Sequence, residues 1–252
     1  MNFSPSPSGE GRGEGMSNAA KNRIALALDL PLPDGIAAWE RVAPHVGVAK
    51  VGLSLFVEHG PRAVEEFLRR GARVFLDLKL HDIPNTVELA AEKAGALGVA
   101  YLTIHASGGA AMVKAAGEGA ARGAAKAGHK TPIILAVTVL TSMDDVALAQ
   151  TGVPAKAREH AQALAQLAVQ SGATGLVCSA REVAEVRAKV GPKIVLCTPG
   201  IRPAGAAAND QARTETPAAA IQAGSDLLVI GRPITTAADM TAAAKAIEAE
   251  LS

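Results

Sequence analysis

Five charged side chains form the clearest chemical pattern in this sequence. Asp77, Lys79 and Asp82 fall within six positions of the stretch FLDLKLHDIPNTV, inside or just after an apolar run. Asp29 and Lys50 lie in two earlier apolar runs. Charges at buried positions are costly unless they are paired. We therefore interpret Asp29, Lys50, Asp77 and Lys79, which alternate in sign, as one network. A lone acid or lysine at a strand end more often belongs to a loop or to a structural ion pair.

A lysine between carboxylates suits a particular kind of catalysis. Nearby negative charge favours the ammonium form, so Lys79 is expected to keep its proton. It is therefore suited to stabilise a carbanion as a fixed positive charge and then to protonate it as a general acid. A Schiff-base mechanism needs a neutral lysine instead, and acidic neighbours disfavour that form.

A second chemical feature lies near the C-terminus, where Gly231 and Arg232 follow the apolar run LLVI. Backbone N–H groups next to glycine, an arginine fork and a helix N-terminus together suit a phosphate dianion. The segment 199–217, which contains Arg202 and Gln211, is unusually long for a connection in a compact domain. We expect it to close over a ligand, with a plain flexible insertion as the alternative.

The elements that must position these residues are short runs of Val, Ile and Leu that alternate with Ala-rich helical stretches. The predicted strands are residues 23–29, 46–53, 73–80, 99–106, 133–141, 175–180, 193–200 and 226–232. Helices are expected in every gap, and a last one from about Thr235. This alternation predicts an α/β fold, a single-domain (β/α)8 TIM barrel. An open doubly wound sheet is the alternative, but the first strand is not followed by a G-x-G-x-x-G turn.

Strand periodicity predicts where the charges point. The even positions of 73–80 are aliphatic and would face the helices, whereas Asp77 and Lys79 would face the barrel interior. By the same alternation, Asp29 and Lys50 also point inward. The network would then lie at the C-terminal ends of strands one to three, the end at which active sites of this fold are built.

Composition limits the partners and the location. The chain is 49% apolar and 19% charged, which fits a globular protein with a large core. A net charge of +1 gives no reason to expect a nucleic acid or an anionic membrane as partner. No apolar run approaches the ~20 residues that span a bilayer. Cys178 and Cys197 lie in apolar runs without a C-x-x-C motif, which predicts buried, reduced thiols and a cytoplasmic location.

The first residues differ from the rest of the chain. Residues 1–21 begin with a Gly-, Ser- and Pro-rich stretch that we predict to be a disordered extension. The stretch lacks the apolar core of a signal peptide. Met16 is a possible true start, and we expect residues 22–252 to form the catalytic barrel domain.

The motif DLKLHDIPNT resembles the D-x-K-x-x-D-I-x-x-T signature of the orotidine 5′-phosphate decarboxylase family. Further stretches are similar to the family in order and spacing, and together they extend over most of the chain. They are ALD (27–29), KVG (50–52), VTVLTS (137–142), TPGIRP (198–203), DQAR (210–213) and IGRPI (230–234).

The resemblance implies decarboxylation of orotidine 5′-phosphate to UMP by a homodimer of barrels, without metal or cofactor. Lys79 would protonate C6 of the pyrimidine, and Asp77 would lie near the substrate carboxylate. Asp82, which the resemblance also makes catalytic, would reach into the partner subunit's site with Ile83 and Thr86. The other implied contacts are Asp29 and Lys50 to the ribose and the charged network, Thr141 and Ser142 to the pyrimidine, and Arg202, Gln211, Gly231 and Arg232 to the phosphate.

Three alternatives share part of this pattern. Phosphosugar decarboxylases and synthases of the same superfamily share the D-x-K-x-x-D core but use Mg²⁺. A Schiff-base aldolase would use a reactive lysine, and a non-catalytic barrel could bind phosphate alone. The stretches HDIPNT and TPGIRP favour the nucleotide enzyme, and the intact charged tetrad argues against a barrel that only binds.

Overall fold

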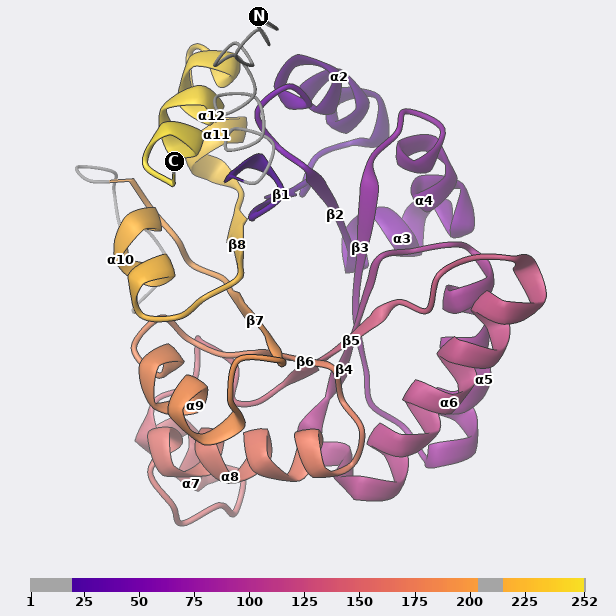
Figure 1. Cartoon of the computed structure of the whole chain (residues 1–252), viewed down its shortest axis with the longest axis vertical. Coiled ribbons are helices and arrows are strands. Elements are labelled where there is room, and N and C mark those ends of the chain that lie inside the picture. The colour runs from indigo at the N-terminus through magenta and orange to yellow at the C-terminus, as the bar shows by residue number, and fades with distance from the viewer. Residues whose placement is uncertain (1–19, 204–214, 252) are drawn as a thin grey trace, which may run out of the picture.

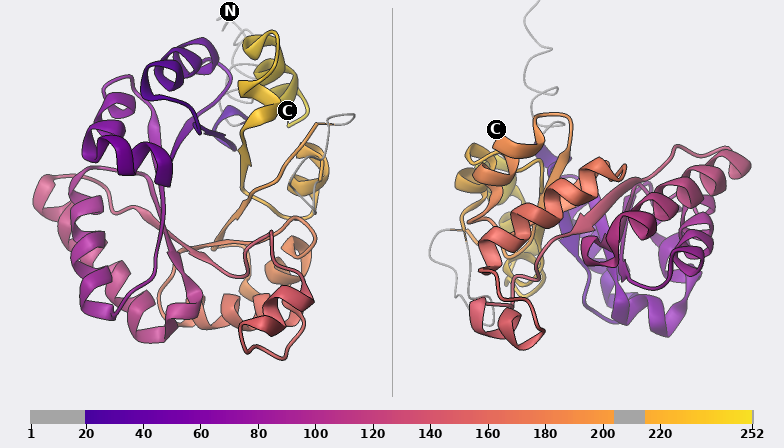
Figure 2. Two further views of the ribbon diagram at one scale, coloured as in Figure 1. Left: turned by 180° about the vertical axis from the view of Figure 1, so that it is seen from behind. Right: turned by 90° about the horizontal axis from the view of Figure 1, so that it is seen from below.

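The computed structural model describes residues 20–203 and 215–251. In these ranges eight parallel strands close into a barrel in the order β1 to β8, and helices surround it (Figures 1 and 2). The strands are β1 (Ile24–Ala27), β2 (Val48–Gly52), β3 (Arg73–Leu80), β4 (Tyr101–His105), β5 (Ile133–Val137), β6 (Gly175–Val177), β7 (Val195–Thr198) and β8 (Leu227–Ile230). The helices are α2 (Leu32–Val42), α3 (Leu53–His59), α4 (Pro61–Leu68), α5 (Pro84–Ala96), the 3-10 turn η1 (Ala106–Gly108), α6 (Gly109–Ala127), α7 (Asp145–Gln150), α8 (Ala157–Gln170), α9 (Val183–Val190), α10 (Pro217–Gln222), α11 (Arg232–Thr235) and α12 (Met240–Ala249). The predicted (β/α)8 barrel is confirmed.

The strands separate two apolar layers, as their alternation predicts. Ile24, Leu26, Val74 and Leu76 belong to the outer layer, which packs between the barrel and the helices. The inner layer fills the barrel and consists of Ala25, Val48, Phe75, Tyr101, Leu135, Cys197 and Leu227. Each large aliphatic side chain buried in these layers contributes about 1.5–3 kcal/mol relative to exposure. The layers therefore fix the register that determines which side chains reach the barrel interior.

Several predicted element boundaries are wrong. The strand predicted over 133–141 ends at Val137, because the chain leaves the sheet there to form a loop. The helix predicted from about Thr235 is instead two helices. α11 begins at Arg232, and α12 begins after Asp239, whose carboxylate accepts a hydrogen bond from the Ala242 N–H and caps the new helix.

The barrel begins slightly before the predicted domain boundary at residue 22. Ala20 is buried, and the carbonyl of Lys21 accepts a hydrogen bond from the N–H of Gly47. The predictions for Met16 and the rest of 1–19 lie outside the described residues. The same holds for Gln211.

Helices α5 and α6 lie side by side and make the most extensive helix–helix contact among the described residues (Figures 1 and 2). A Cβ atom at Gly119 or Gly123 of α6 would collide with the carbonyl oxygens of Glu88 and Glu92 of α5. The guanidinium of Arg122 forms ion pairs with both glutamates. This packing fixes α5, and α5 positions the segment HDIPNT that leads into it.

Candidate active site

A cavity of about 390 Å³ opens at the C-terminal ends of the barrel strands. Residues at the ends of every strand except β4 line it, together with the loops that follow. Phe75, Val137, Val177 and Cys197 give it an apolar part, and Phe75 and Cys197 of these belong to the inner layer. A cavity of this size and mixed lining suits a small-molecule ligand, and its position is that of barrel active sites.

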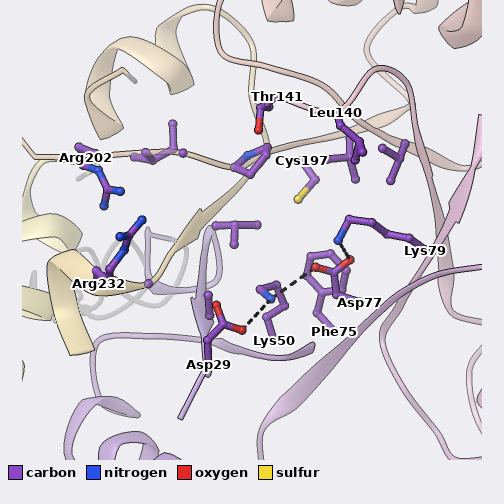
Figure 3. A pocket seen from close by; sticks show the side chains of 18 of the residues that line it. Asp29, Lys50, Phe75, Asp77, Lys79, Leu140, Thr141, Cys197, Arg202 and Arg232 are labelled. Atoms are coloured by element: carbon purple, nitrogen blue, oxygen red, sulfur yellow. Dashed lines mark hydrogen bonds and ion pairs between the residues drawn. The ribbon is translucent and has the colours of Figure 1, made fainter. Parts of the chain in front are cut away.

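One wall of the cavity carries the predicted charged network (Figure 3). The Nζ atom of Lys79 lies 2.8 Å from Oδ1 of Asp77, and Nζ of Lys50 lies 3.4 Å from Oδ2 of the same carboxylate. Asp29 extends the chain, with its Oδ1 3.8 Å from Lys50 Nζ. A Cβ atom at Gly52 would lie 3.2 Å from Lys50 Nζ, so the glycine leaves the lysine its space. The structure therefore brings together the four charges that sequence reasoning assigned to one network.

Asp77 is the centre of this network and is ionised. Burial alone would raise the pKa of its carboxyl group. The charges of Lys50 and Lys79, with hydrogen bonds from Lys79 and Thr103, outweigh burial and hold the pKa below its usual value. Its side chain is 11% exposed and that of Lys50 is 9% exposed, whereas that of Lys79 is 32% exposed. Lys79 is thus the more accessible of the two ammonium groups.

Sequence reasoning missed Thr103, which contacts this network from β4. Its hydroxyl donates a hydrogen bond to Asp77 Oδ1 and accepts one from the backbone N–H of Lys79, each at 2.9 Å. The side chain is fully buried. The signal that could have found it is its position: a polar residue on the inward face of a strand, two positions from the inner-layer residue Tyr101.

Two arginines lie on the other side of the cavity from Lys79 (Figure 3). Arg202 is only 8% exposed, and its Nε atom is buried without a hydrogen-bond partner in the part of the chain that the structure describes. Its backbone N–H donates to the carbonyl of Glu215, which joins the two ends of the 199–217 segment. Arg232 follows Gly231, where a Cβ atom would lie 3.2 Å from that of Ala27. The pair suits an anionic group.

The predicted site residues divide into three groups. Those that line the cavity are Asp29, Lys50, Asp77, Lys79, Thr141, Arg202, Gly231 and Arg232. Those that do not line it are the exposed residues Asp82, Ile83, Thr86 and Ser142. Gln211 is outside the described residues. The Asp82 carboxylate accepts a hydrogen bond from the N–H of Ile83, the residue that precedes α5.

Three further features bear on the sequence predictions. Cys178 and Cys197 are free and buried, as predicted; burial raises the pKa of Cys178 to about 12 and raises that of Cys197 well above its usual value. Both thiols are therefore protonated and poorly nucleophilic at neutral pH.

Within residues 20–203 and 215–251, no helix has the length and apolar character to cross a membrane. The same ranges hold no cluster of three His, Cys, Asp or Glu residues arranged for a metal ion.

The fold and the cavity define a (β/α)8-barrel enzyme with a charged network on one wall of the cavity and two arginines on the other side. Comparison with known proteins narrows this class. The family described as "Orotidine 5'-phosphate decarboxylase / HUMPS family" matches residues 22–247, and the chain belongs to this family.

Named relatives agree with this assignment. The chain is 54% identical to an orotidine 5′-phosphate decarboxylase of Anaeromyxobacter sp. (strain K), over 91% of this chain and 98% of that protein. It is also 54% identical to one of Thermobifida fusca (strain YX), over 90% and 95% respectively. A crystal structure of orotidine 5′-phosphate decarboxylase from Lactobacillus acidophilus superimposes with a TM-score of 0.81 at 39% identity, covering 92% of this chain and 99% of that one. The chain is accordingly an enzyme of the carboxy-lyase class.

Proposed function

We propose that the protein decarboxylates orotidine 5′-phosphate to UMP in pyrimidine biosynthesis, without a metal or an organic cofactor. The observation that carries the proposal is the Lys50–Asp77–Lys79 network on one cavity wall, with Arg202 and Arg232 on the other side (Figure 3). A nucleotide has this polarity, because its phosphate and its reacting base are at opposite ends. The relatives named above carry the same activity in their names.

In the proposed reaction, the bond between C6 and the carboxylate breaks and the electron pair stays on C6. This pair occupies an orbital in the ring plane, where the ring π system cannot delocalise it. The ammonium of Lys79 stabilises the carbanion and then donates a proton to C6, which gives UMP and CO2. The lysine recovers its proton from solvent. Asp77 holds Nζ of Lys79 at 2.8 Å and so aims the proton.

The remaining contacts follow from the two ends of the cavity. We propose that Lys50, besides completing the catalytic network, contacts the ribose with Asp29, and that Thr141 contacts the pyrimidine. Ser142, for which the same contact was predicted, does not line the cavity. Arg202, Arg232 and the backbone at Gly231 would bind the phosphate, with Gln211 of the connecting segment. Phosphate binding would then hold the reacting carbon against Lys79, so that remote binding energy lowers the barrier.

We further propose a homodimer in which Asp82, Ile83 and Thr86 complete the partner's site. Support comes from their exposure next to, but outside, the cavity of their own chain. Ile83 is 66% exposed, and Leu53 and Val57 on α3 and Leu89 on α5 are other large apolar side chains exposed to solvent. A second copy would bury this apolar area. The two buried, reduced thiols support a cytoplasmic location.

The proposed domain organisation is a catalytic barrel over residues 22–252 that follows an N-terminal extension. The match of the family to residues 22–247 supports it. Translation from Met16 is part of the same proposal, and the intact mass of the native protein tests it.

The test of function is the loss of orotidylate absorbance when the substrate is mixed with purified, EDTA-treated protein. Turnover that EDTA does not reduce is the expected result. No turnover of orotidylate, together with Mg²⁺-dependent and EDTA-sensitive turnover of a keto-sugar phosphate, would favour the phosphosugar alternative. Lys79→Ala should abolish turnover while the protein stays folded, and covalent trapping of Lys79 by borohydride with a carbonyl substrate would contradict the acid role.

A further inference from the structure

The ladder between β3 and β4 is interrupted opposite Thr103. Leu76 pairs with Leu102, and the next pair is Leu80 with Ile104. Three residues of β3 therefore oppose the single residue Thr103 of β4. This is a bulge, and bulges leave backbone groups without their regular partner and re-aim side chains. The two catalytic side chains of β3, Asp77 and Lys79, both lie in the bulged segment.

The bulge gives Lys79 an unusual backbone. Its φ angle is 50°, and it is the one non-glycine residue with a positive φ in the described ranges. The left-handed conformation is unfavourable for a residue with a Cβ atom, so it persists only where the surroundings impose it. The Lys79 N–H, displaced from the regular ladder, donates instead to the hydroxyl of Thr103.

The Thr103 hydroxyl uses both of its hydrogen-bonding functions within this bulge. It accepts from the Lys79 N–H and donates to Asp77 Oδ1, and that same oxygen accepts from Lys79 Nζ. The contacts form a closed ring through the backbone and the side chain of Lys79. Hydrogen bonds linked in this way polarise one another and fix each member's position.

We propose that Thr103 is a positioning residue: its hydroxyl holds the left-handed backbone of Lys79 and one oxygen of Asp77, and so aims the ammonium at the reacting carbon. Thr103 does not line the cavity, so it acts through these two residues and not on the ligand. The kinetic part of this inference rests on the proposed function. The structural part, the hydroxyl as anchor of the bulge, does not.

The test compares Thr103→Val, which keeps the shape and removes the hydroxyl, with Thr103→Ser, which keeps the hydroxyl. Thr174→Val is the matched control, because Thr174 also accepts a strand N–H, that of Ile134, but just ahead of β6 at the opposite end of the barrel. For Thr103→Val we expect kcat to fall about tenfold to a hundredfold, the range of a displaced catalytic group. We expect KM for orotidylate and Kd for UMP to stay within about twofold, because the phosphate end is untouched.

Amide exchange of ¹⁵N-lysine-labelled protein provides an independent measurement. The Lys79 N–H should be protected in the wild type and in Thr103→Ser, and should exchange faster in Thr103→Val. Thr174→Val should leave both kcat and this exchange unchanged.

Different results would overturn the anchoring role of Thr103 and the proposed decarboxylase function. Rapid exchange of the Lys79 N–H in the wild type would overturn the anchoring role even if Thr103→Val does not fold. Wild-type kcat in Thr103→Val, or equal impairment of Thr103→Ser and Thr103→Val, would also overturn it. A wild-type protein with a protected Lys79 amide that does not turn over orotidylate would instead refute the proposed function and leave the anchor intact.

Discussion

Asp77→Asn keeps the shape of the central side chain of the network and removes its charge. In the native protein, Oδ1 of Asp77 accepts hydrogen bonds from Lys79 Nζ and Thr103, and Oδ2 lies 3.4 Å from Lys50 Nζ. An asparagine oxygen could still accept from Lys79. Its NH2 group would then face the ammonium of Lys50, so a donor would meet a donor.

The distances give the size of the effect. At an effective dielectric constant of ~20, the pairs at 2.8 and 3.4 Å are worth about 6 and about 5 kcal/mol before desolvation. Much of this offsets the cost of burying the groups, and breaking a buried pair typically costs about 3–5 kcal/mol. Among the described residues, Lys50, whose side chain is 9% exposed, would keep only Asp29 at 3.8 Å as an ionic contact, and the Asp29 side chain is 70% exposed. We therefore expect a net loss of about 3 kcal/mol of unfolding free energy, or a Tm lower by about 6–12 °C.

The assay is thermal and urea unfolding followed by circular dichroism, with Asp29→Asn as the matched control. The control makes the same chemical change on an exposed carboxylate, so its unfolding free energy should change by less than about 1 kcal/mol. The folded-state pKa of Asp77 lies below the usual value of an aspartate. The stabilisation by its charge is therefore present above the unfolded-state pKa and is lost as the pH falls through the folded-state pKa. The difference between wild type and Asp77→Asn should accordingly shrink below about pH 4. Equal Tm values for the two variants at pH 7, or a difference that grows on acidification, would refute this reasoning.

Three other predictions concern the remaining parts of the molecule. Arg232→Ala should weaken UMP binding about tenfold to a hundredfold by calorimetry, the worth of a charge-assisted hydrogen bond, while uridine binding is unchanged; unaltered UMP affinity would contradict the phosphate assignment. Mixing Lys79→Ala subunits with Asp82→Ala subunits should restore about a quarter of wild-type turnover, because random exchange gives half mixed dimers with one intact site each; no recovery would argue against a shared site. The Arg187 guanidinium donates to three backbone carbonyls. Arg187→Ala should therefore lower the urea midpoint of unfolding more than Arg187→Lys, and both variants should keep the wild-type KM. A changed KM would contradict this purely structural role and show that Arg187 acts on the active site.

Alternation was enough to predict the barrel and the direction of the main charges. In RVFLDLKL the aliphatic residues recur every second position, and burying them against the helices leaves Asp77 and Lys79 for the interior. The same period placed Lys50 correctly. These predictions succeed because the side-chain period of a strand is a local property that burial of one face fixes.

The bulge in β3 could not be predicted in this way. RVFLDLKL alternates without a break, so nothing in it marks the point where three residues oppose one. Thr103 lies 24 residues away along the chain, in a strand where a β-branched residue is ordinary. The sequence analysis also predicted one terminal helix where the structure has two, although Asp239 has the capping chemistry that begins α12. A tertiary contact decides the bulge, and local patterns carry little of that information, whereas the start of α12 follows from a local cap.

Unfavourable local features concentrate at one place in this protein. A lysine has a left-handed backbone, a carboxylate is buried between two ammonium groups, and a bulge interrupts a central strand. The left-handed backbone and the bulge each lower stability, and the buried charges are favourable only as a complete set, whereas the two apolar layers elsewhere follow the strand period closely. A sequence selected for stability alone would have no reason to keep all three at Asp77 and Lys79. What they achieve together is an accessible ammonium fixed against one wall of the cavity, which is what protonation of a localised carbanion requires.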